Sequence, residues 1–121
     1  RLLWQAGHTD EHLLSFRRAL AAHPDNPDLL VGLANRLTLS GAAPEAVALL
    51  APAAARGVGG VLVLHGLGRA LWSAARPDEA LAAFRAALDR DADHAPTLRE
   101  LARAALILDR PASATEAIER L

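Results

Sequence analysis

The sequence predicts an all-α fold, a solenoid of antiparallel helix pairs, on three observations. Side chains of similar kind recur every 34 residues along the whole chain, as at Phe16, Leu50, Phe84 and Ile118. Proline beside an acidic residue, which favours a helix start, alternates with glycine, which favours a helix end. Apolar residues make up 52% of the chain and aromatic residues only 3%, so the core must be aliphatic and rich in alanine, which suits closely packed helices.

The repeat keeps one register throughout the chain. A fixed period of this length is typical of a solenoid, in which each unit buries its apolar face only against its neighbours. The register makes residues 1–121 a single repeat domain, with a partial unit 1–26, complete units 27–60 and 61–94, and a partial unit 95–121. Neither end resembles the polar cap of a solenoid, so we expect the chain to be part of a longer protein. Further positions share the interval: Ala19, Ala53 and Ala87; Ala46, Ala80 and Ala114; Leu33, Leu67 and Leu101; Leu3, Leu37 and Leu71.

Local signals place the first helix boundaries. A helix that carries Phe16 should end near Ala22, because Pro24 cannot continue it. Asn26 should cap the next helix, and Pro27 should take its first position, where a missing N–H group costs nothing. These signals predict the junction between the first two units.

Unit 27–60 should begin with a helix over 28–40, and its partner helix should open at Pro44. Pro52 should kink this partner or end it early near Ala51, because proline removes a hydrogen bond and its ring clashes one turn back. A loose, glycine-rich connection should follow over 57–60. The core-facing stripe of the first helix is predicted at Leu30, Leu33, Ala34 and Leu37.

Units 61–94 and 95–121 repeat this pattern. We expect first helices over 62–74 and 97–108, and a partner helix from Pro77 to about Arg90. Gly68 should allow a neighbouring helix to approach closely, and Pro111 should start the last helix. The core-facing residues are predicted to be Leu64, Leu67, Gly68 and Leu71 in one helix and Leu98, Leu101, Ala102 and Ala105 in the other.

The repeat resembles that of the tetratricopeptide repeat (TPR) family. With each unit numbered from its first residue, that family favours a bulky residue at position 4, Leu at 7, a small residue at 8, Gly at 15, Ala at 20, an aromatic residue at 24, Ala at 27 and Pro near 32. The resemblance implies a right-handed superhelix whose first helices line a concave groove for a protein or peptide. The matching residues are Leu64, Leu67, Gly68, Ala80, Phe84 and Ala87; Leu30, Leu33, Ala34, Gly41, Ala46, Leu50 and Ala53; and Gly7, Phe16, Ala19 and Pro24.

Charge and composition limit the classes of partner. All 13 basic residues are Arg, and the net charge is −1, so a general attraction to nucleic acid or to an anionic membrane is not implied. No apolar run approaches the roughly 20 residues of a membrane span, and no signal peptide pattern is present. The lack of cysteine removes disulfides and Cys-based zinc sites but does not identify the compartment, for which we favour the cytoplasm.

Two short motifs suggest chemistry that the register argues against. The string over 8–12, which begins at His8 and ends at His12, matches a zinc motif of metalloproteases. His8 falls in a turn, His12 takes a position that is Ala in the other units, and no third ligand is apparent. The glycines over 57–68 lack the preceding strand that a dinucleotide loop requires. We therefore expect no metal, no cofactor and no catalytic residue.

The candidate binding residues come from repeat positions 5, 9 and 12, which share one face of each first helix beside the core stripe. Arg binds carboxylates in bidentate fashion, and Trp and Arg are frequent interface anchors, so this face suits an extended acidic or carboxylate-bearing peptide. Some TPR grooves clamp a peptide carboxylate with Lys, Arg and Asn, a pattern matched only in part here because Lys is absent. The candidates are Asn35, His65, Arg69, Trp72, Arg99, Arg103 and Trp4.

Several alternatives stay open at this point. The face could simply be solvated, with Trp4 and Trp72 packed between neighbouring first helices. Gly32 and Gly66, at position 6, would leave room for a ligand or represent tolerated drift. The expected function is that of a non-catalytic interaction scaffold for a protein or peptide partner. The alternatives are an accessory repeat region of a larger bacterial enzyme (sulfotransferase, glycosyltransferase or dioxygenase-like) and self-association through uncapped ends.

Overall fold

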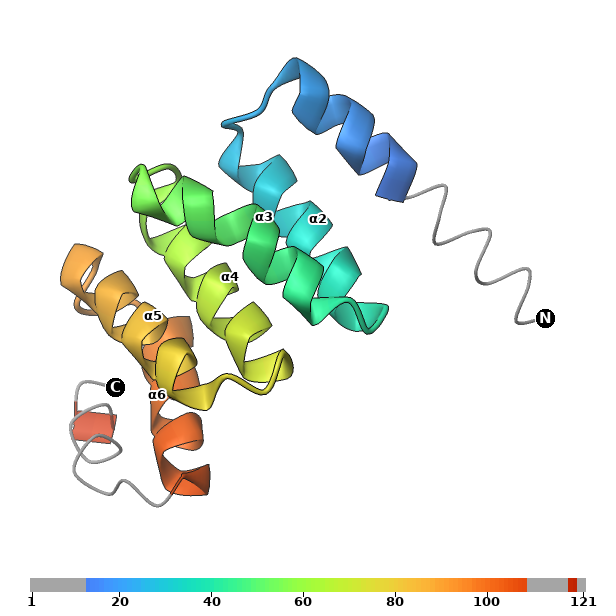
Figure 1. The fold of residues 1–121 in the computed structure, drawn as a ribbon. Coiled ribbons are helices and arrows are strands. Elements are labelled where there is room, and N and C mark those ends of the chain that lie inside the picture. Colours follow the sequence, from blue (N-terminus) through green and yellow to red (C-terminus); the bar gives the residue numbers. More distant parts are fainter. Residues whose placement is uncertain (1–12, 109–117, 120–121) are drawn as a thin grey trace.

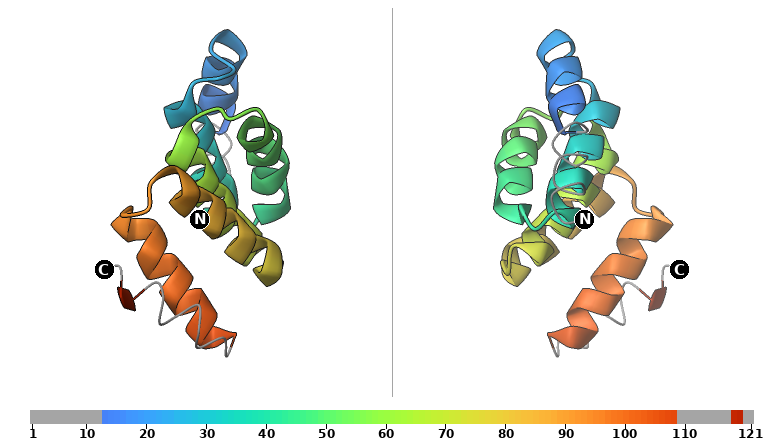
Figure 2. Two further views of the ribbon diagram at one scale, coloured as in Figure 1. Left: turned by 90° about the vertical axis from the view of Figure 1, so that its left-hand side faces the viewer. Right: turned by 90° about the vertical axis from the view of Figure 1, so that its right-hand side faces the viewer.

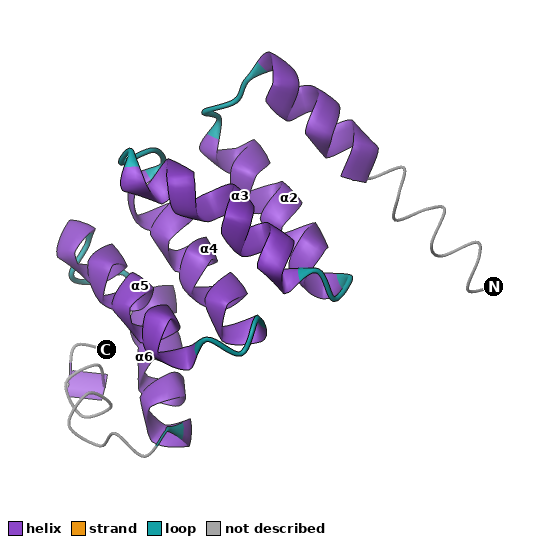
Figure 3. Ribbon diagram, viewed as in Figure 1, coloured by secondary structure: helices purple, strands orange, loops and turns teal. Residues whose placement is uncertain are grey.

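The computed structural model describes residues 13–108 and 118–119, and all regular structure among them is helical (Figure 3). The prediction of an all-α fold is therefore confirmed. A first helix covers residues 13–22 within the described part. The labelled helices that follow are α2 (Pro27–Leu39), α3 (Ala43–Ala55), α4 (Gly60–Ser73), α5 (Pro77–Arg90) and α6 (Ala95–Ile107).

The helices form a stack in chain order, from the helix over 13–22 at one end to α6 at the other (Figures 1 and 2). Each labelled helix packs on the next, and α2 also packs directly on α4. The helices α4 and α6, which hold the same place in successive units, approach each other less closely. The first helices α2, α4 and α6 therefore make up one layer of a helical repeat.

The expected capping signals operate at the helix ends. The side chain of Asn26 accepts a hydrogen bond of 3.1 Å from the backbone N–H of Leu29, and proline occupies the first turn of α2, α3, α5 and α6. Gly41, just past the end of α2, has a φ of 86°, a left-handed conformation that glycine adopts at little cost. Ala75 follows α4 at the same repeat position and is also left-handed, with a φ of 61°.

The expectation that Pro52 ends its helix early is wrong, because α3 continues through Pro52 to Ala55. Both Pro52 and Ala48, whose carbonyl group loses its helical donor, are exposed, so water can bind the orphaned oxygen. The buried face of α3, in contrast, is uninterrupted, since Leu50 and Ala53 lie on either side of the proline and are almost fully buried. Packing thus holds the last turn in place.

The repeat register describes the core well. Leu50 and Phe84, at repeat position 24, are 0% and 1% exposed. Ala46 and Ala80, at repeat position 20, are both 0% exposed. The predicted stripes of α2 and α6 are also buried. Phe16 is half-buried and packs against the same core, whereas Ile118 remains exposed.

One core assignment in α4 was wrong. Leu64 is only half-buried, while its neighbour Val63 is fully buried. The reason lies in the turn before the helix, where Gly59 is left-handed and a Cβ atom built on it would meet both Val63 and Pro27. This turn and the start of α2 cover Val63, so the inward position shifts by one residue at the start of α4.

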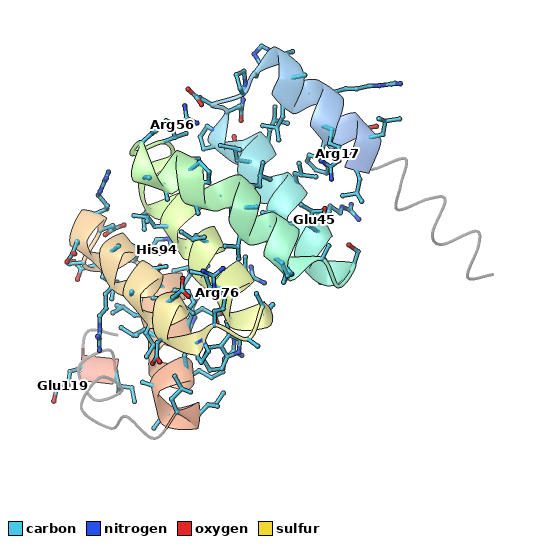
Figure 4. The ribbon with its side chains drawn as sticks, viewed as in Figure 1. Arg17, Glu45, Arg56, Arg76, His94 and Glu119 are labelled. Carbon is cyan, nitrogen blue, oxygen red and sulfur yellow. The ribbon has the colours of Figure 1, made fainter. Side chains whose placement is uncertain are left out.

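Exposed ion pairs connect the first described helix to α3. The guanidinium group of Arg17 lies 3.5 Å from the carboxylate of Glu45, and that of Arg56 lies 3.0 Å from Asp25 (Figure 4). Such exposed pairs each contribute little to the free energy of unfolding, of the order of 0–1 kcal/mol. The stacking of the helices rests on the aliphatic core.

Candidate functional site

A pocket of about 310 Å³ lies across the three first helices. It brings together four of the predicted binding residues, Asn35 from α2, Arg69 and Trp72 from α4, and Arg103 from α6. The remaining lining residues are Thr38, Leu39, Ser73 and Glu100. The shared register explains this convergence, because equivalent positions on parallel, stacked helices lie side by side.

The side chains in this pocket differ in how firmly they are held. Asn35, Arg69 and Arg103 are exposed, whereas Trp72 is half-buried and packs against the hydrophobic core. Trp72 thus packs against the core and also forms a wall of the pocket. It offers a ligand a rigid apolar surface flanked by charged groups.

The two arginines of the pocket are electrostatically different. Arg103 donates a hydrogen bond of 2.9 Å from Nη2 to Oε2 of Glu100, in an ion pair along α6. Within the described part of the chain, Arg69 has no hydrogen-bonding or ion-pair partner. The guanidinium group of Arg69 is therefore open to a ligand, whereas that of Arg103 already has a carboxylate.

Sequence reasoning missed Glu100. It occupies repeat position 6, which is Gly32 in α2 and Gly66 in α4, and it precedes Arg103 by three residues. Acidic and basic side chains at that spacing are neighbours on a helix surface. The change from glycine to glutamate at this repeat position, beside an arginine, was the signal that could have revealed it.

The suggestion that Gly32 and Gly66 leave room for a ligand is wrong. A Cβ atom on Gly32 would lie 2.7 Å from the ring of Phe16, and one on Gly66 would lie 3.4 Å from Leu50. Side chains of this chain therefore lie against both glycines. At Gly32 the missing Cβ atom allows the ring of Phe16 to approach closely, whereas at Gly66 a Cβ atom would make only an ordinary contact with Leu50.

His65 and Arg99 do not line the pocket, and Trp4 lies outside the described residues. Arg99 is exposed on α6. His65 is half-buried, with its ring centroid 6.0 Å from that of Phe84 and 5.6 Å from that of His94, and its Nε2 atom is buried without a hydrogen-bond partner.

The pKa of His65 is lowered from its ordinary value. Burial is the main cause, and the positive charge of Arg69 and the neighbouring His94 act in the same direction, whereas Glu100 opposes them. His94 itself shares a hydrogen bond of 2.6 Å between Nδ1 and the hydroxyl group of Thr97, at the start of α6. Burial and the positive charge of Arg69 therefore favour the neutral form of His65.

Two tetratricopeptide repeat models match the chain, one over residues 3–59 and the other over residues 65–121. The chain belongs to the tetratricopeptide repeat family. No curated protein matches this TPR chain closely enough to add a functional assignment.

Solved structures of MamA have the same fold as this TPR chain. A MamA structure labelled AMB-1 is 26% identical, with a TM-score of 0.73, and the match covers 96% of this chain and 68% of that one. A structure labelled MSR-1 is 24% identical, with a TM-score of 0.71 and coverage of 96% and 69%. A further MamA crystal structure is 20% identical, with a TM-score of 0.78 and coverage of 96% and 68%. The chain thus spans about two thirds of the length of these proteins.

A second pocket of the TPR chain, of about 230 Å³, adjoins the first. It lies between α4 and α6, and its apolar walls come from Trp72, Phe84, Ala104 and Ile107. Glu100 and Arg103 line both pockets, together with Trp72. The Glu100–Arg103 ion pair therefore stands at the junction of a charged pocket and an apolar one.

The described part of the TPR chain contains neither a cluster suited to a metal ion nor a helix suited to span a membrane. Among residues 13–108 and 118–119, no three His, Asp or Glu side chains are arranged to bind a metal ion. The string from His8 to His12 lies outside the described residues. No helix in the described part has both the length and the apolar character that crossing a bilayer demands.

Proposed function

We propose that this TPR chain binds an extended segment of a partner protein across α2, α4 and α6, and that a carboxylate of the ligand binds Arg69. The family and the helical-repeat fold support, in general terms, a role as a protein-interaction scaffold. The finer assignment rests on the pocket that joins Asn35, Arg69, Trp72 and Arg103.

The single observation that carries the proposal is the guanidinium group of Arg69, which lines the pocket together with Trp72 and has no ion-pair or hydrogen-bonding partner among the described residues. A guanidinium group presents donors in a planar fork that matches both oxygens of a carboxylate. The half-buried ring of Trp72 is held by the core and supplies apolar contact area at little cost in conformational entropy. Together they can hold an acidic residue and part of the ligand beside it.

Peptide binding tests this proposal directly. Purified protein is titrated into fluorescein-labelled peptides of equal length that are acidic, neutral or basic, and fluorescence anisotropy reports binding. We expect the acidic peptides to bind best. The variant Arg69→Glu should weaken their binding roughly 10-fold or more, because a charge-assisted hydrogen bond contributes about 1.5–3 kcal/mol and the new charge repels the ligand.

The matched control is Arg18→Glu, which makes the same charge change at an exposed residue outside both pockets. Its affinity for acidic peptides should remain close to that of the parent, and both variants should keep the parent's helical circular dichroism. Equal affinities of the parent and Arg69→Glu for the acidic peptides would reject the assignment of Arg69.

A further inference from the structure

Unit 95–121 departs at position 6 from the packing rule of units 27–60 and 61–94. In those two units this position is glycine, and a large side chain from the preceding helix packs onto it, Phe16 onto Gly32 and Leu50 onto Gly66. The equivalent pair at the start of unit 95–121 is Phe84 and Glu100. Phe84 instead packs onto Gly68 of its own helix pair, where a Cβ atom would lie 2.5 Å from the ring.

This departure leaves the apolar pocket between α4 and α6. A glutamate side chain cannot be buried against Phe84 without losing its hydration, and that of Glu100 instead stays partly exposed and pairs with Arg103. The helices α4 and α6 remain further apart than α2 and α4, and the pocket of about 230 Å³ lies between Trp72 and Ile107. Ile107 is 64% exposed, so its side chain is available to a ligand.

Glu100 also sets the charge of the groove. Its side chain is only 28% exposed, against 70% for Arg103, so the carboxylate is the better-held partner of the ion pair. A ligand carboxylate that approaches Arg103 must displace Glu100 or lie beside it, and two carboxylates at close range repel each other. Arg69 meets no such competitor in the described part of the chain.

We propose that Glu100 determines ligand selectivity: the groove accepts one carboxylate, at Arg69, together with an apolar side chain in the pocket between Trp72 and Ile107, and it disfavours a second carboxylate at Arg103. This inference rests on the proposed function and specifies the chemistry of the peptide. The occupant is a peptide segment in which a single acidic residue lies near a leucine-like side chain.

Three peptide types test the selectivity by fluorescence anisotropy. All are acetylated and amidated, so that no terminal charge contributes. The first carries one glutamate and one leucine separated by a variable number of serines, the second replaces the leucine with a second glutamate, and the third replaces it with serine. The titrations are run at about pH 8, above the ordinary pKa of histidine, so that His65 stays neutral.

The parent protein should bind the first peptide several-fold more tightly than the other two. Glu100→Gln, which keeps the shape of the side chain but removes its charge, should raise the affinity for the diacidic peptide roughly fivefold and change that for the first peptide less than about twofold. Arg103→Gln should lower the affinity for the diacidic peptide further, because it leaves Glu100 without its cation. A merely structural role for the ion pair would leave the ratio of the affinities for the first peptide and the diacidic peptide unchanged.

The outcomes separate the two proposals. If Arg69→Gln weakens all three peptides but Glu100→Gln leaves the ratio of affinities as in the parent, the selectivity role of Glu100 is wrong and the groove assignment survives. If Arg69→Gln changes none of the affinities, the groove assignment itself fails. If the parent binds the serine peptide as tightly as the leucine peptide, the apolar pocket takes no part in binding.

Discussion

The contact between Gly68 and Phe84 leads to a sharp prediction about stability. A methyl group added at Gly68 would place its carbon 2.5 Å, 2.6 Å and 3.0 Å from three atoms of the Phe84 ring. The ring is 1% exposed, so it has little free space into which to move. The matched control lies two residues away in the same helix, where a Cβ atom on Gly66 would make only ordinary contacts at 3.4 Å or more.

The magnitude follows from two opposing terms. Overpacking of a well-packed core costs about 1–3 kcal/mol. Alanine in place of glycine in a helix interior returns up to about 1 kcal/mol. Gly68→Ala should therefore lower the free energy of unfolding by up to about 3 kcal/mol, whereas Gly66→Ala should leave it unchanged or raise it by up to about 1 kcal/mol.

The neighbouring unit suggests how the clash should be relieved. Unit 27–60 has Ala34 and Leu50 where unit 61–94 has Gly68 and Phe84. Alanine thus accompanies leucine in one unit, and the smaller glycine accompanies the larger phenylalanine in the other. The double variant Gly68→Ala, Phe84→Leu copies this arrangement. It should be more stable than the sum of the two single effects predicts, by about 0.5 kcal/mol or more.

Urea unfolding followed by helical circular dichroism measures all four variants, and equal m-values are needed for the comparison. Equal stabilities of Gly68→Ala and Gly66→Ala would refute the close contact between the helix and the ring. A strictly additive double variant would show that the two positions do not share the same space.

Three further predictions concern the turn, the core and pH. Ala75→Gly should raise the free energy of unfolding by roughly 0.5–1 kcal/mol, because the residue is left-handed, and Gly41→Ala should lower it; thermal melts check both signs. Ala80→Leu should destabilise by roughly 1–3 kcal/mol, since Ala80 is fully buried, and an unchanged melting temperature would contradict the register. Because the pKa of folded His65 is lowered, its neutral form stabilises the fold above about pH 6.5, and this contribution should be lost as pH falls below that value. His65→Gln should flatten the dependence of urea stability on acidic pH, and an identical dependence in parent and variant would refute the assignment.

The sequence predicted the parts of the fold that repetition and local chemistry determine. The capping by Asn26 and the buried positions of Leu50 and Phe84 follow from signals that need no knowledge of distant contacts. The convergence of Asn35, Arg69 and Arg103 also followed, because stacked units bring equal repeat positions together. A constant register thus transfers local information along the chain.

The failures arose where contacts between elements decide the outcome. Pro52 was expected to kink α3 or to end it early near Ala51, but α3 continues to Ala55. The helix-breaking effect of one residue is local, and the buried face of α3 outweighs it. Val63 is buried by the turn at Gly59, a contact that the helical period cannot predict. The pairing of Glu100 with Arg103 is a different case, because their spacing on one helix could have revealed it.

The packing of Trp72 affects how the groove should be probed. Its ring is held by the core, so under the proposed function it would contribute contact area without a large loss of conformational entropy. Arg69 is exposed and would have to be immobilised on binding, so its contribution would be mainly to specificity for a carboxylate. A Trp72→Ala variant would lower stability and affinity together and could not separate the two. Charge changes at Arg69 and Glu100, which lie outside the buried core, should alter ligand recognition with little effect on the stability of the helical stack. These substitutions therefore discriminate between a binding groove and a solvated helix face.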